Sequence, residues 1–194
     1  MCGSPVRLDR CGIVGAMKTP RDPDCYWVED GRLLAGEYPG SFDPDTARAK
    51  LGALLEAGIR TFVDLTEADE LEPYRALLEE EACARGIAIA CHCMPIQDVS
   101  VPDRETMRRI LETLDGALSA GLPAYVHCWG GVGRTGTVVG CWLIEHGCPA
   151  GEALDAIRRL RKPCGKQATS SPETSGQRAF VTAWLPGAAE GPGR

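Results

Sequence analysis

Two reactive residue types frame one glycine-rich stretch of this 194-residue chain. Cys128 comes first, Arg134 follows six positions later, and glycines stand between them at positions 130, 131 and 133. A cysteine thiolate is a strong nucleophile, and a guanidinium group binds two oxygens of a phosphate at once. The spacing is weak evidence by itself, because ten cysteines and many arginines give about one such pair by chance.

The flanking sequence supplies the evidence that the spacing lacks. An apolar run at residues 124–126 predicts a buried strand, and a second run at residues 138–144 predicts a buried helix. A strand, a glycine-rich turn and a helix N-terminus together form an anion site, because backbone N–H groups at a helix start have no partner within the helix. We therefore predict that residues 128–135 form a loop that holds a phosphate while Cys128 attacks it.

Each residue of this loop has a predicted role. Glycine lets the backbone turn its N–H groups inward around a tetrahedral oxyanion. The predicted phosphate-binding residues are Trp129, Gly130, Gly131, Val132, Gly133 and Arg134. Thr135 is predicted to donate a hydrogen bond to the sulfur when it leaves, and His127 either supports the loop through hydrogen bonds or is a buried structural residue.

The leaving group needs a proton, which a carboxyl group on a neighbouring loop would supply. Asp98 and Asp103 precede Cys128 by 30 and 25 residues. Asp98 lies within a predicted loop, whereas Asp103 is placed to cap a helix. We predict that Asp98 is the general acid.

Alternating strands and helices predict an α/β single domain with a mainly parallel central sheet flanked by helices. Strands are expected at residues 59–65, 87–91 and 124–126, after a hairpin whose arms are residues 26–28 and 32–35. Helices are expected at residues 43–58, 70–85, 103–120 and 150–161, after the glycine-rich loop from about residue 138, and from residue 172. We predict a flexible extension at residues 1–24, the domain at residues 25–186 and a disordered tail at residues 187–194.

Composition excludes several classes of protein. A formal net charge of −6 without a cluster of basic residues argues against a nucleic-acid partner. No leader peptide and no membrane-spanning run are visible, so we expect no membrane association and a cytoplasmic location. Dispersed cysteines predict free thiols in a reducing compartment. Cys91-His92-Cys93 is interpreted as structural rather than metal-binding, and no metal or cofactor is expected.

Two stretches of the chain resemble a known family. VHCWGGVGRTGT, at residues 126–137, is similar to the signature loop of the cysteine-dependent protein tyrosine and dual-specificity phosphatases. PIQDVSVPD, at residues 95–103, resembles the general-acid loop of their small members, especially the cyclin-dependent kinase-associated phosphatase type. The resemblance implies a cysteinyl-phosphate formed on Cys128, with Arg134, Asp98 and Thr135 in the roles given above. It also implies that Gln177 positions the hydrolytic water, although the first glutamine of that segment is replaced by Glu173.

The sequence is compatible with three functions. The expected function is hydrolysis of protein phosphotyrosine, and also of phosphoserine or phosphothreonine, with a phosphorylated protein or peptide as the partner. The alternatives are a phosphatase of a small-molecule or nucleic-acid 5′ phosphate, and a phosphate-binding module without turnover. The residues between Cys128 and Arg134 carry no charge, which makes a polyphosphoinositide a poor fit.

Overall fold

The computed structural model describes residues 24–166 and 168–187, which form one α/β domain around a five-stranded sheet. The strand order is β1-β2-β5-β3-β4. The strands are β1 (Cys25–Glu29), β2 (Leu33–Gly36), β3 (Thr61–Asp64), β4 (Ala90–Cys93) and β5 (Ala124–His127). β1 and β2 pair as an antiparallel hairpin, and every other neighbouring pair is parallel. The predicted fold class is confirmed, while nearly all of the predicted extension and tail lies outside the described residues.

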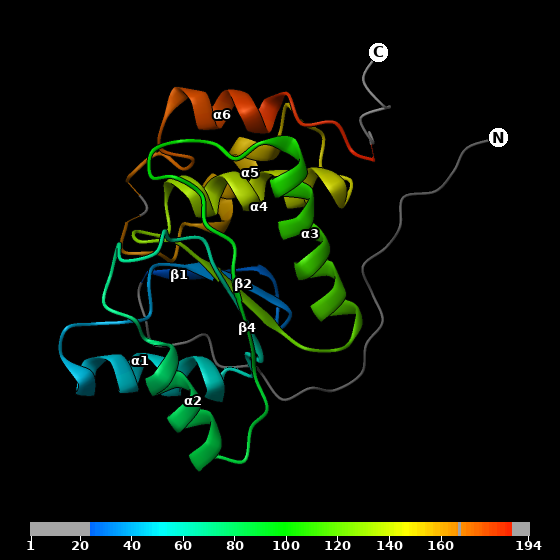
Figure 1. Cartoon of the computed structure of the whole chain (residues 1–194). Coiled ribbons are helices and arrows are strands. Elements are labelled where there is room, and N and C mark those ends of the chain that lie inside the picture. Colours follow the sequence, from blue (N-terminus) through cyan, green and yellow to red (C-terminus); the bar gives the residue numbers. More distant parts are fainter. Residues whose placement is uncertain (1–23, 167, 188–194) are drawn as a thin grey trace.

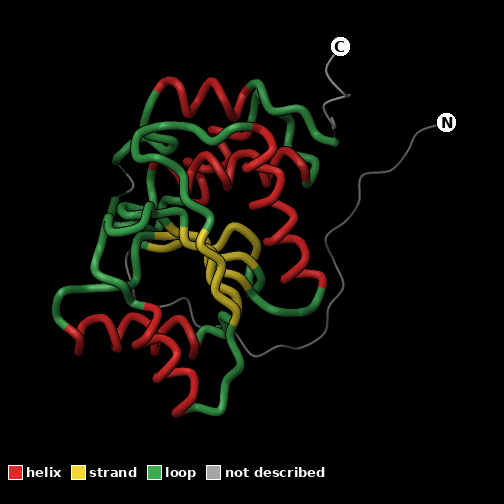
Figure 2. Tube along the Cα trace, viewed as in Figure 1, coloured by secondary structure: helices red, strands yellow, loops and turns green. Residues whose placement is uncertain are grey.

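Helices cover both faces of the sheet (Figure 1). α1 (Pro44–Glu56) and α2 (Arg75–Ala84) pack on one face. The other face carries α3 (Arg104–Ser119), α4 (Gly133–Glu145), α5 (Ala153–Leu160) and α6 (Ser175–Thr182). Figure 2 shows the resulting three layers, with the strands between two groups of helices.

Alternation of side chains along the strands builds a separate apolar core on each face of the sheet. On β5, Tyr125 packs in the core beneath α1 and α2, while Val126 packs in the core beneath the other four helices. Phe62 and Val63 on β3 divide in the same way. Both cores fix β5 in the middle of the molecule, so the residues that follow it start from a rigid position.

The carboxyl ends of the parallel strands meet at one edge of the sheet. There the N–H of Leu65 donates to the carbonyl of His127 at 2.9 Å, and the N–H of Ile96 donates to the carbonyl of Leu65 at 3.0 Å. The segments that leave β5, β3 and β4 are therefore joined side by side. Open α/β sheets bind their ligands at this edge.

Two helices begin as predicted, each with an aspartate cap. The Asp43 side chain accepts from the N–H of Thr46 at 3.1 Å and starts α1, which has proline in its first turn. The Asp103 side chain accepts from the N–H of Thr106 at 2.6 Å and starts α3. Such caps satisfy N–H groups that have no partner within the helix.

Other boundaries differ from the predictions for local reasons. The helix expected from residue 70 begins only at Arg75, because Asp69 has a φ of 63° and Pro73 interrupts the preceding turn. The last helix begins at Ser175, where Thr174 and Gln177 form a capping box. α5 begins at residue 153 rather than 150, and β4 covers residues 90–93 rather than 87–91.

The glycine-rich loop is shorter than the eight residues expected. α4 begins at Gly133, so Arg134 and Thr135 belong to its first turn. The helix therefore fixes the direction of both side chains, as a loop would not.

Among the described residues, no helix is both long enough and apolar enough to span a bilayer. Cys91 and Cys93 point to one face of β4 and His92 to the other, because successive strand residues alternate.

Candidate active site

The phosphate loop, residues 128–135, runs from the end of β5 into the first turn of α4. Its backbone is held from outside. The N–H of Tyr38 donates to the carbonyl of Trp129 at 2.9 Å, and the hydroxyl of Ser171 donates to the carbonyl of Val132 at 2.7 Å. Gly131 has a φ of 66°, and a Cβ placed on it would lie 2.4 Å from the carbonyl carbon of Gly36. Only glycine fits there, because the loop packs directly on the backbone at the end of β2.

These contacts use carbonyl groups and leave the N–H groups of the loop free. Within residues 24–166 and 168–187, no backbone N–H from Trp129 to Thr135 donates a hydrogen bond to any other group. Buried backbone N–H groups are nearly always paired, so a run of unpartnered donors at a helix start is the expected form of an anion site. Cys128 lies at the entrance to this run and is 3% exposed.

Arg134 completes the site from the first turn of α4. The guanidinium is 1% exposed and binds Glu70 with both oxygens, Nη1 to Oε2 at 2.7 Å and Nη2 to Oε1 at 2.5 Å. Nη1 also donates to the carbonyls of Ile96 at 3.1 Å and Leu65 at 3.4 Å. Nε is buried and has no hydrogen-bond partner in the described part of the chain. Glu70 and the two carbonyls thus orient the group, and Nε remains available to a ligand.

The Arg134–Glu70 pair stays charged in spite of its surroundings. Hydrogen bonds from Arg134 lower the pKa of Glu70. Burial works against the charge on Arg134, but its hydrogen bonds to Glu70, followed by nearby negative charge, raise the pKa of Arg134 above its ordinary value. The site therefore keeps a fixed positive charge next to Cys128.

Asp98 lies on the acid loop, residues 94–102, between β4 and α3. One Asp98 oxygen is 3.0 Å from Nη2 of Arg134, and the side chain is 51% exposed. Cys128, Arg134 and Asp98 line the same 290 Å³ cavity. The structure thus brings together the three residues to which the sequence analysis gave the main chemical roles. Asp103 is used as the cap of α3, as predicted.

Thr135 and His127 are both fully buried beside the nucleophile. The Thr135 hydroxyl has no hydrogen-bond partner among the described residues, so it is available to a sulfur or phosphate atom. His127 Nε2 shares a hydrogen bond of 2.8 Å with the hydroxyl of Tyr74, and its ring stacks on Tyr125. Burial lowers the pKa of His127 to about 4, which the nearby Asp64 carboxylate only partly opposes. His127 is therefore a neutral residue that supports the start of the loop.

Gln177 lies beneath the phosphate loop with its amide already bonded. The amide oxygen accepts from the N–H groups of Glu173 and Thr174, and the amide nitrogen donates to the carbonyl of Ser100 at 3.0 Å. Gln177 thus ties α6 to the acid loop, and its water-positioning role stays a prediction. The Glu173 carboxylate reaches the same cavity, since a Cβ on Gly133 would lie 3.2 Å from it.

Sequence reasoning missed two residues of the site. The sequence pattern predicts a helix at Glu70, yet Glu70 lies in the connector before α2 and binds Arg134. The pattern predicts no role for Tyr74, yet Tyr74 holds His127. A carboxylate just beyond the end of a central strand was a usable signal for Glu70. No sequence signal marks Tyr74.

Comparisons with known proteins agree with this geometry. The Arabidopsis thaliana protein "Phosphatidylinositol 3,4,5-trisphosphate 3-phosphatase and protein-tyrosine-phosphatase PTEN1" is 27% identical over 165 residues, which are 84% of this chain and 38% of that protein. The crystal structure of Tk-PTP in its active form has a TM-score of 0.64 at 26% identity and covers 82% of this chain and 94% of its own. The crystal structure of kinase-associated phosphatase with its catalytic cysteine changed to serine also has a TM-score of 0.64, at 24% identity. It covers 84% of this chain and 93% of its own.

The chain spans about half or less of the length of the curated relatives that it matches. The family match itself covers most of the chain, residues 22–182, and includes every residue of the site. The resemblance seen in the two loop sequences is therefore confirmed, and the chain belongs to the family described as "Swiss Army Knife protein, DSP-PTPase phosphatase domain".

Proposed function

We propose that this chain hydrolyses phosphate monoesters on proteins, phosphotyrosine and also phosphoserine or phosphothreonine, through a cysteinyl-phosphate. The observation that carries the proposal is the run of unpartnered N–H groups between Cys128 and the fixed guanidinium of Arg134. These donors surround the position that the equatorial oxygens of a transferring phosphoryl group would take. A nucleophile at one end and a fixed cation at the other favour transfer over simple binding.

In the first step the Cys128 sulfur attacks phosphorus, and the bond from phosphorus to the ester oxygen breaks. Asp98 gives its proton to that oxygen, so the leaving group departs as a neutral hydroxyl. The attacking form of a cysteine nucleophile is the thiolate. In the second step water attacks phosphorus and gives its proton to the Asp98 carboxylate. The sulfur leaves as thiolate with a hydrogen bond from Thr135, and inorganic phosphate is released.

A phosphoinositide substrate is the main competing candidate, because the PTEN1 relative carries a phosphoinositide phosphatase activity in its name. The residues between Cys128 and Arg134 offer no cation for a further phosphate. Lys166 does line the same cavity, but its ammonium group lies 2.8 Å from the Glu37 carboxylate. The charges around the site therefore favour a substrate with a single phosphate.

The test is release of phosphate from three peptides that differ only in phosphotyrosine, phosphoserine or phosphothreonine, with phosphatidylinositol trisphosphate in a fourth arm. We expect turnover of the phosphotyrosine peptide, inhibition by vanadate, and no turnover by Cys128→Ser. Hydrolysis of the lipid without hydrolysis of any peptide would overturn the protein-phosphatase assignment. Retained turnover in Cys128→Ser would overturn the mechanism.

A further inference from the structure

The cavity at the phosphate loop is one end of a longer groove. It shares the Trp129 side chain with a second cavity of 240 Å³. That second cavity shares Tyr38 and Leu71 with a third of 380 Å³, which extends to the edge of β4. We call the second and third cavities together the side groove. It leads away from the nucleophile on the side of the sheet that α1 and α2 cover.

Two of the most exposed aromatic side chains among the described residues line the part of this groove nearest the nucleophile. Phe42 is 89% exposed and Trp129 is 60% exposed, and both border the second cavity. Large apolar side chains that are exposed to solvent beside a reactive site are typical of a surface that binds a ligand. The faces of aromatic rings also attract cations.

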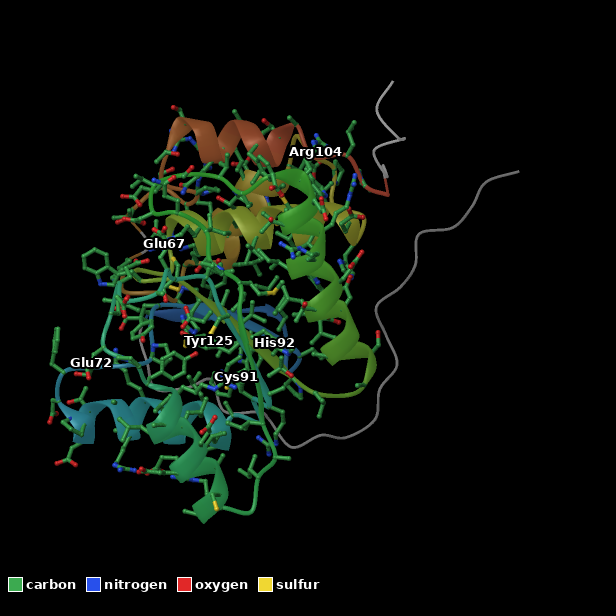
Figure 3. The ribbon with its side chains drawn as sticks, viewed as in Figure 1. Glu67, Glu72, Cys91, His92, Arg104 and Tyr125 are labelled. Carbon is green, nitrogen blue, oxygen red and sulfur yellow. The ribbon has the colours of Figure 1, made fainter. Side chains whose placement is uncertain are left out.

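The charges of the side groove are predominantly negative. Its walls include five carboxylates and two basic side chains, counted over the described residues. Both basic groups already have a carboxylate partner, because Lys50 lies 2.7 Å from Glu37 and Arg75 lies 3.1 Å from Glu79. Glu67 and Glu72 point out on the same side of the molecule (Figure 3). A ligand that follows the groove therefore meets an excess of negative charge.

We propose that the side groove binds the polypeptide next to the phosphorylated residue and selects a lysine or arginine in it. This inference rests on the proposed function and names its substrate class. The phosphate occupies the N–H groups of the phosphate loop. A basic side chain of the same peptide then lies between Trp129 and Phe42 with its charge toward Glu72. A polyphosphorylated ligand would bring its further phosphates against these carboxylates, so the groove opposes it.

The experiment compares four phosphotyrosine peptides of one length. One has alanine around the phosphotyrosine, and two others have arginine either before or after it. The fourth has glutamate at both places. Partly exposed ion pairs and cation–π contacts each contribute up to about 1 kcal/mol, so we expect the better arginine peptide to exceed the alanine peptide in kcat/KM by about 5-fold. The glutamate peptide should fall below the alanine peptide, and raising the salt concentration to about 0.5 M should reduce both differences.

Variants locate the preference on the protein. Glu72→Gln should reduce the ratio between the arginine and alanine peptides by at least about 2-fold, because one exposed ion pair is lost. Phe42→Ala should also reduce this ratio. The matched control is Glu112→Gln, which removes another exposed carboxylate, on α3, and should leave the ratio unchanged. Because each ratio is taken within one variant, a general loss of activity cancels.

The outcomes separate this inference from the proposed function. Turnover of all four peptides at equal kcat/KM would overturn the groove and leave the phosphatase intact. An arginine preference that Glu72→Gln and Phe42→Ala both leave unchanged would also overturn the groove. Failure of every peptide, with the alanine peptide included, would instead overturn the protein-phosphatase assignment on which the inference rests.

Discussion

The two loops that meet over the reactive cysteine are built in opposite ways. The phosphate loop is buried except at Trp129 and Gly130, with Cys128 3% and Arg134 1% exposed, and hydrogen bonds from the segments after β2 and α5 hold its carbonyls. The acid loop is anchored by the buried Ile96 but is open to solvent at residues 97–99. Val99 is 60% exposed with a φ of 52°, a backbone conformation that is costly for a β-branched residue. One loop is a fixed part of the core and the other lies on the surface.

This difference matches the two tasks. Stabilising charge on a phosphoryl group works best when the donors are in place beforehand, so that none of them must reorganise during the reaction. Protonating a leaving group demands less of the fold, because leaving groups differ in size and the acid must reach each of them. We infer that the phosphate loop sets whether phosphate transfer occurs at all, whereas the acid loop sets how fast a given ester reacts.

The strongest test of this comparison replaces the cation of the phosphate loop. Arg134→Lys keeps a charge but loses the planar group that binds Glu70 with two hydrogen bonds. We expect kcat to fall by about 10³-fold for good and poor leaving groups alike. The readout is kcat for two aryl phosphates that differ only in leaving-group pKa. A loss confined to the poor leaving group would show that the two loops do not divide the work in this way.

The acid loop has a matched pair of aspartates. Asp98→Asn should lower kcat by about 10²-fold for a poor leaving group and far less for a good one, and should remove the decline in rate at high pH. Asp103→Asn should retain activity, because asparagine also caps a helix. The measurement is the pH–rate profile of both variants with both esters. If Asp103→Asn loses activity in this way and Asp98→Asn does not, Asp103 is the general acid.

How far the sequence predicted each loop depends on how local its contacts are. The phosphate loop was predictable because its strand, glycines and helix are consecutive, and the cap of Asp103 onto Thr106 is equally local. The bond between Glu70 and Arg134 joins residues 64 apart and depends on how the connector after β3 turns. The periodic sequence pattern predicts a helix through that connector, because no clear sequence signal marks the positive φ of Asp69. The contact between Glu70 and Arg134 therefore depends on tertiary structure, which a local sequence pattern does not predict.

Burial of His127 beside the phosphate loop also predicts that the stability of the protein depends on pH. Burial lowers the pKa of His127 from 6.5 to about 4, so the folded state resists a proton that the unfolded state accepts. This contribution is fully present above pH 6.5 and is lost as the pH falls toward 4. At pH 5 the loss is about 2 kcal/mol of unfolding free energy relative to pH 7. The pKa of Glu70 in the folded state lies below its ordinary value of 4.5, so the stability that its charge contributes is lost only at lower pH.

The measurement is urea unfolding at pH 5 and pH 7 for the wild type and for His127→Asn. Asparagine has no group that titrates in this range, so the variant should show a smaller difference between the two pH values, whatever its absolute stability. Equal differences in both proteins would mean that His127 is not the group responsible.

The smallest effect distinguishes the two valines of the acid loop. Val99→Gly removes a side chain from a residue with positive φ, which relieves steric strain and offsets the entropy that glycine gains in the unfolded chain. Val101 has no positive φ and is 37% exposed, so Val101→Gly gains no such relief. We expect the unfolding free energy of Val99→Gly to exceed that of Val101→Gly by about 1 kcal/mol. If the two variants are equally destabilised, the strain at Val99 is not a property of the folded loop, and the contrast between a fixed loop and a surface loop would rest on exposure alone.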